Sequence, residues 1–79
     1  MWRHFQTVIE GDAFDLNGIN PWTYASNGWQ STGEHAQVSD PTHRQDYRMP
    51  VYRITVDGRT VEFAAGEHSA NVWGFYVRK

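Results

Sequence analysis

The sequence predicts an all-β fold: a small antiparallel sheet or partly open barrel of about five to seven short strands, joined by sequential hairpins. Two runs rich in β-forming residues, 51–56 and 59–64, are separated only by Asp57-Gly58, which accepts positive φ at both central positions of a tight hairpin turn. Aromatic residues make up 15% of the chain and include four tryptophans, whereas Leu16 is the single leucine. This composition favours a sheet over a helical bundle.

The length of the chain predicts one domain. With 79 residues and 9.2 kDa, residues 1–79 are expected to form a single small β unit, in which burial of apolar surface is barely sufficient for stability. The sequence contains no cysteine, so neither a disulfide nor a thiolate metal site can compensate. Stability is therefore expected from the aromatic side chains, which bury the most area per residue.

The two-residue turn at Asp57-Gly58 also fixes how its two strands pair. One face then collects apolar side chains, and the other pairs hydroxyl groups and opposite charges. A shift of one residue would move Glu62 to the apolar face, so the register is well specified. The directly opposite pairs are Val56 with Arg59, Ile54 with Val61, Tyr52 with Phe63, Thr55 with Thr60, and Arg53 with Glu62.

Three further segments have strand character. Residues 71–77 are apolar on both sides, which predicts a central strand beside the hairpin. The side chains of residues 3–10 would alternate between two faces, as in a strand. Gly11-Asp12 fits a type II′ turn that would pair this strand with residues 14–16 in a second hairpin. Residues 22–25 are expected to form a short strand.

Residues 33–48 are mostly polar and are expected to form a long connection. Such a connection in a compact domain usually carries function or is mobile.

The charge pattern narrows the classes of partner. Seven Lys and Arg residues against nine Asp and Glu residues give a formal charge of −2, with no basic cluster, so a nucleic-acid partner is not expected. No apolar run approaches the length of a membrane span, so no membrane partner is expected either. The amino terminus lacks the layout of a signal peptide. We therefore expect a cytoplasmic location, and a bacterial or phage origin.

A repeated tripeptide is the strongest candidate for chemistry. Gly-Glu-His occurs at 33–35 and at 66–68, so His35, His68 and Glu67 are candidate ligands of a divalent metal. Matches this short usually arise by chance, and a polar loop tripeptide that occurs twice is the simpler explanation.

The second copy resembles the second motif of the cupin family, in which a strand ends in a Pro-x-Gly turn and presents a metal-binding histidine followed by an asparagine. Ala64 stands where the family has proline, and both the Gly-to-His and the His-to-Asn spacings are one residue short. The resemblance implies that His68 is a metal ligand, with His35 or His4 as a partner, in a small-molecule enzyme or sensor. The residues that carry it are Gly58, residues 63–68 and Asn71.

The leading hypothesis is a non-catalytic interaction module that uses no cofactor. The sequence has no cysteine nucleophile, Gly-x-Ser-x-Gly elbow or phosphate-binding glycine loop, which leaves catalysis uncertain and disfavours it. Aromatic side chains outnumber what one small core encloses, and exposed Trp and Tyr are typical of binding hot spots. The large number of aromatic residues is explained equally well if they fill the core and only their edges are exposed. The residues proposed to hold a protein partner, together with the 33–48 segment, are Trp22, Tyr24, Trp29 and Tyr47.

Two other interactions fit the same features. Trp22 and Trp29 would suit stacking on the rings of a sugar ligand. A chain this short is also expected to leave an open sheet edge, and pairing two such edges would give a homodimer.

Overall fold

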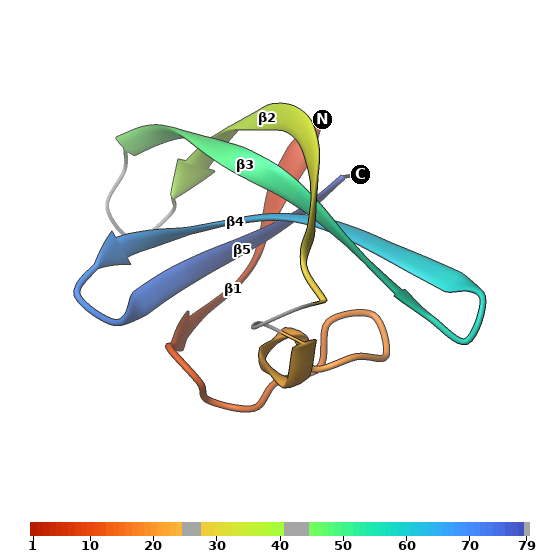
Figure 1. The fold of residues 1–79 in the computed structure, drawn as a ribbon. Helices are drawn as coiled ribbons and strands as arrows, with labels where there is room; N and C mark the ends of the chain where they lie inside the picture. The colour runs from red at the N-terminus through yellow and green to blue at the C-terminus, as the bar shows by residue number, and fades with distance from the viewer. Residues whose placement is uncertain (25–27, 41–44, 79) are drawn as a thin grey trace.

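The computed structural model describes residues 1–24, 28–40 and 45–78, which form one antiparallel sheet that is not closed into a barrel (Figure 1). This confirms the predicted all-β fold with hairpin connections. The strand order within these residues is β1-β5-β4-β3-β2. The elements in chain order are β1 (Trp2–Ile9), the 3₁₀ helix η1 (Pro21–Tyr24), β2 (Gln30–Asp40), β3 (Gln45–Val56), β4 (Arg59–Ser69) and β5 (Val72–Arg78).

The β3–β4 hairpin has the predicted register at every pair, from Val51 opposite Ala64 to Val56 opposite Arg59. Asp57 and Gly58 both have positive φ, 51° and 76°, as a two-residue hairpin turn requires. The strand over residues 71–77 is β5, and it lies between β1 and β4 as predicted for a central strand.

The predicted second hairpin is wrong, because β1 pairs with β5 and not with residues 14–16. The chain turns one residue earlier than a type II′ turn at Gly11-Asp12 would require. The Asp12 N–H donates to the Ile9 carbonyl oxygen at 3.0 Å, and Gly11, the third residue of this turn, has a φ of 88°. The segment after this turn packs against one face of the sheet, where Leu16 and Ile19 are buried.

Two other sequence predictions are also wrong. Residues 21–24 form a 3₁₀ helix instead of a strand, and Ala25 lies outside the described residues. The expected connection over 33–48 consists of strand on both sides of residues 41–44, which are likewise outside the described part. Buried Ala36 and Val38 alternate with exposed neighbours, so the polar composition belongs to a half-buried strand.

Both faces of the sheet are buried. The first face is covered by the segment between β1 and β2, which runs beneath the sheet in Figure 1. The second face is enclosed because the sheet curls until β2 contacts β1, although these strands are at opposite ends of the strand order. The first-face cluster contains Val8, Leu16, Ile19, Ile54, Val61, Phe63, Ala65, Phe75 and Val77. The second-face cluster contains Ala36, Val38, Met49, Val51, Ala64 and Tyr76.

Arg78 joins the two ends of the curled sheet. Its guanidinium donates to the carboxylates of Glu34 in β2 and Glu62 in β4, each at 3.0 Å, and lies 4.5 Å from the ring centroid of Trp2 in β1. The hydrogen bonds to Glu34 and Glu62 raise the pKa of Arg78 above its ordinary value. Because the side chains of Arg78, Glu34 and Glu62 are 39–47% exposed, these ion pairs contribute little to stability.

The predicted homodimer stays a prediction. The pairing of β1 shifts register between His4 and Gln6, and the pairing of β2 shifts between Ser31 and His35. Bulges in edge strands oppose continuous pairing with another edge. Any contact between two copies through β1 or β2 is therefore restricted to part of each edge.

Two glycines make room for the side chains on the second face. Gly66 in β4 lies directly opposite Gly74 in β5. A Cβ on Gly74 would collide with the imidazole of His68 and lie 3.1 Å from the Tyr76 ring, whereas a Cβ on Gly66 would meet Sδ of Met49 at 3.0 Å. A methionine side chain can move away more easily than two packed rings.

We expect Gly74→Ala to lower the free energy of unfolding by about 1–3 kcal/mol, the usual effect of overpacking. Gly66→Ala is the matched control and should have a clearly smaller effect, because only Met49 has to move. Urea denaturation followed by tryptophan fluorescence measures both. Equal effects of the two substitutions would contradict this account of the glycine pair.

Candidate functional site: an aromatic pocket on the first face

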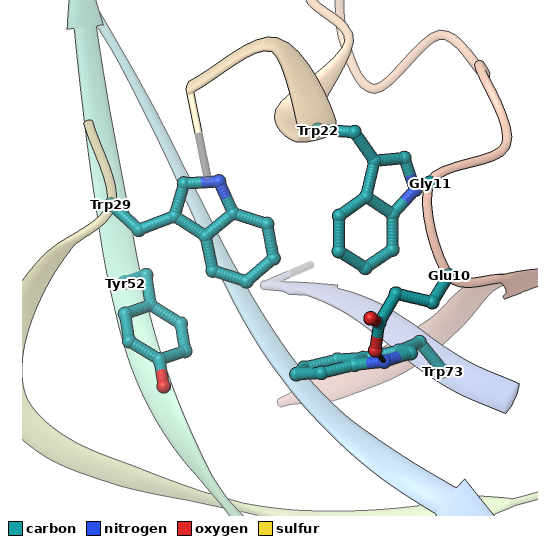
Figure 2. Close-up of a pocket in the computed structure, with 6 residues that line it drawn as sticks. All are labelled: Glu10, Gly11, Trp22, Trp29, Tyr52 and Trp73. Atoms are coloured by element: carbon teal, nitrogen blue, oxygen red, sulfur yellow. Dashed lines mark hydrogen bonds between the residues drawn. The ribbon is translucent and has the colours of Figure 1, made fainter. Parts of the chain in front are cut away.

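A pocket of about 450 Å³ opens where the covering segment meets the sheet (Figure 2). This volume is within the roughly 300–1,000 Å³ range of small-molecule sites. The lining comes from the turn after β1, from η1, from the residue before β2, and from the sheet strands β3 and β5. The lining residues are Glu10, Gly11, Trp22, Trp29, Tyr52 and Trp73.

Trp29 is fixed by a hydrogen bond and by ring contacts. Its indole Nε1–H donates to the Pro21 carbonyl oxygen at 2.7 Å, which ties the start of β2 to η1. Its ring meets Phe63 edge to face, with ring centroids 5.0 Å apart and planes at 87°. Gly28 permits the close approach, since its N–H donates to the Tyr24 carbonyl at 2.6 Å and a Cβ there would collide with Tyr24.

Trp22 is held differently. Its backbone N–H donates to Asn20 Oδ1 at 3.2 Å, which supports the start of η1. Its ring lies 5.6 Å from that of Trp29, with 33° between the planes, and stands nearly perpendicular to Phe75 at 5.5 Å. Its indole Nε1–H is buried without a hydrogen-bond partner among the described residues. Within the described residues, packing against other rings and not a side-chain hydrogen bond therefore positions the indole.

Glu10 and Trp73 form the polar side of the pocket. The indole Nε1–H of Trp73 donates to Glu10 Oε1 at 2.8 Å, as Figure 2 shows. The Glu10 backbone N–H donates to the Asn71 carbonyl oxygen at 2.8 Å, which continues the pairing of β1 and β5 past Ile9. Glu10 is thus held at the pocket through hydrogen bonds of both its backbone and its exposed carboxylate.

The arrangement is suited to binding. Among the described residues that line the pocket, the ionisable groups are the Glu10 carboxylate and the Tyr52 phenol. Ring surface provides apolar contact and attracts cations, and the carboxylate can accept hydrogen bonds.

The structure brings together two of the four residues predicted to bind. Trp22 and Trp29 line the pocket, whereas Tyr24 packs against the first-face cluster outside the pocket lining. Tyr47 lies on the second face, where its ring centroid is 4.6 Å from that of His68.

Sequence reasoning missed four lining residues: Glu10, Gly11, Tyr52 and Trp73. The predicted register already placed Tyr52 opposite Phe63 on the apolar face, and Trp73 is two positions before Phe75 on the central strand and so shares its face. That shared face was the available signal. The pairing of β1 with β5, which brings Glu10 and Gly11 beside these rings, had no such local signal.

The two candidate histidine ligands lie on separate strands, and Glu67 precedes His68 on β4. His35 is exposed on β2, and His68 is on β4 with its Nε2 3.0 Å from the Tyr76 hydroxyl. Glu67 Oε2 accepts the Asn71 N–H at 2.8 Å. Within residues 1–24, 28–40 and 45–78, no group of three or more His, Asp or Glu side chains could hold a metal ion. The expected strand-ending turn of the cupin motif is also not formed, because residues 63–68 lie inside β4.

Comparison of the chain with protein families, with curated proteins and with solved structures finds no match. In the described segments no helix has the length and apolar character needed to cross a membrane.

We expect Trp29→Phe to lower the free energy of unfolding by about 1–3 kcal/mol more than Trp22→Phe does. Both changes remove an indole N–H from the same pocket. The first leaves the carbonyl of fully buried Pro21 without its donor, whereas the second removes a donor that is already unpaired. Chemical denaturation measures both variants, and a larger loss for Trp22→Phe would contradict the prediction.

Proposed function

We propose that the protein is a small, non-catalytic, cytoplasmic binding module that captures a side chain of a protein partner in the aromatic pocket. The observation that carries the proposal is the convergence of three tryptophans, one tyrosine and one carboxylate on a cavity of about 450 Å³. None of the described residues of the 33–48 segment is in this lining, so the proposal rests on the first face alone.

Exposure separates the pocket rings from rings that serve only the core. Phe63 and Phe75, on the same face, are both 0% exposed, whereas Tyr52 and Trp73 are only partly buried beside them. Large half-buried aromatic side chains grouped in a concave site are typical of binding hot spots. A partner's side chain in the pocket would bury the ring surfaces that remain exposed in the folded protein.

The ring geometry supports an inserted side chain over a stacked sugar. The ring centroids of Trp22 and Trp29 are only 5.6 Å apart, so no sugar ring fits between them. Trp73 stands at 86° to Trp22 and at 89° to Trp29, so the three rings do not form one flat platform. A recess bounded by rings at right angles suits a compact group that enters end-on.

A matched pair of tyrosine variants tests the proposal. Peptides are selected from a phage-displayed random library on the wild-type protein, and their affinity is measured for Tyr52→Ala and Tyr47→Ala. Both tyrosines are half-buried on β3, but only Tyr52 lines the pocket. We expect Tyr52→Ala to weaken the selected peptides at least about tenfold, the size of a hot-spot effect, and Tyr47→Ala to leave their affinity unchanged.

Thermal melts of each variant show whether it is folded. Peptides that depend on Tyr47 and not on Tyr52 would place binding on the second face and contradict the proposal. A folded wild-type protein that selects no peptide would also count against it.

A further inference from the structure

The pocket combines a negative charge with ring faces in several orientations. Figure 2 shows Trp73 edge-on below Trp22 and Trp29, with the Glu10 carboxylate beside its nitrogen. The near-perpendicular planes of Trp73 and the other two indoles mean that a group in the recess meets ring surface from more than one direction. Ring faces carry negative potential, so such a recess favours a cation over a neutral group of the same shape.

Glu10 gives the pocket its charge. No basic side chain is among the described lining residues, so the carboxylate is not neutralised within the pocket. Its Oε1 already accepts the Trp73 N–H, which leaves Oε2 for a ligand. An anionic ligand would meet both the carboxylate and the ring faces, and both would oppose it.

Resting on the proposed function, we infer that the partner's side chain ends in an alkylated ammonium group, as a methylated lysine does. A guanidinium is best held by two carboxylate oxygens in a fork, whereas here one oxygen is engaged by Trp73. An ammonium group needs no such pairing. Alkyl groups on its nitrogen can contact several rings at once while the positive charge stays close to Glu10, the arrangement by which aromatic cages recognise quaternary ammonium ligands.

The test compares the affinities of a cation and of a neutral compound of the same shape. The probes are blocked trimethyllysine and the same compound with a tert-butyl group in place of trimethylammonium, titrated while the tryptophan indole N–H signals are followed by NMR. We expect the cation to bind about three to thirty times more tightly than the neutral compound. Glu10→Gln should remove most of this preference while it keeps an acceptor for Trp73.

Asp15→Asn is the control, because it makes the same change of charge at an exposed loop residue outside the pocket lining. It should leave the preference for the cation unchanged. A preference lost equally in Asp15→Asn and in Glu10→Gln would mean that net charge alone attracts the probe, which overturns the inference.

The outcomes separate the inference from the proposed function. Equal binding of both probes, or binding of neither while selected peptides still depend on Tyr52, overturns the cation inference and leaves the binding module standing. Selected peptides that ignore Tyr52 overturn the proposed function itself. An oligosaccharide that shifts the pocket indole signals equally in wild type and in Glu10→Gln overturns both.

Discussion

The indole of Trp29 is the contact on which the first face depends. Its N–H holds the carbonyl of Pro21, and its ring packs against residues of η1, β3, β4 and β5. One side chain therefore fixes the covering segment to the sheet and also forms a wall of the pocket. Since the chain is short and has a single leucine, a large ring is the economical way to join so many elements.

The chain has few residues with which to bury the two faces of the sheet, and each face is buried in a different way. The second face is closed by curling, with the glycine pair Gly66 and Gly74 making space for rings and with Arg78 linking the two ends. The first face is closed by a separate segment whose described residues lie outside the five strands. Rings at the border of that segment stay partly exposed, and the pocket forms there. Its aromatic lining thus follows from how the face is covered.

The predictions from sequence succeeded where local chemistry decides the structure. Asp57-Gly58 fixed a turn and with it a full register, and the apolar character of residues 71–77 on both sides placed β5 inside the sheet. They failed where the partner is distant in the chain. Gly11 allows several turns, and pairing of β1 with β5 depends on residues some seventy positions away. For the same reason Trp22 and Trp29 could be proposed from composition, whereas Glu10 and Trp73 become neighbours only through that pairing.

The pairing of β1 with β5 also determines when the fold can form. The first strand finds its only neighbour in the sheet order, β5, among the last residues described, with Trp2 opposite Arg78. Closing so long a loop has a large entropic cost before any contact offsets it, and topologies dominated by distant contacts fold slowly. During synthesis the β3–β4 hairpin can form as soon as it leaves the ribosome. β1 must wait unpaired until residues 72–78 have emerged, and during that interval the apolar side of β1 is exposed to other chains.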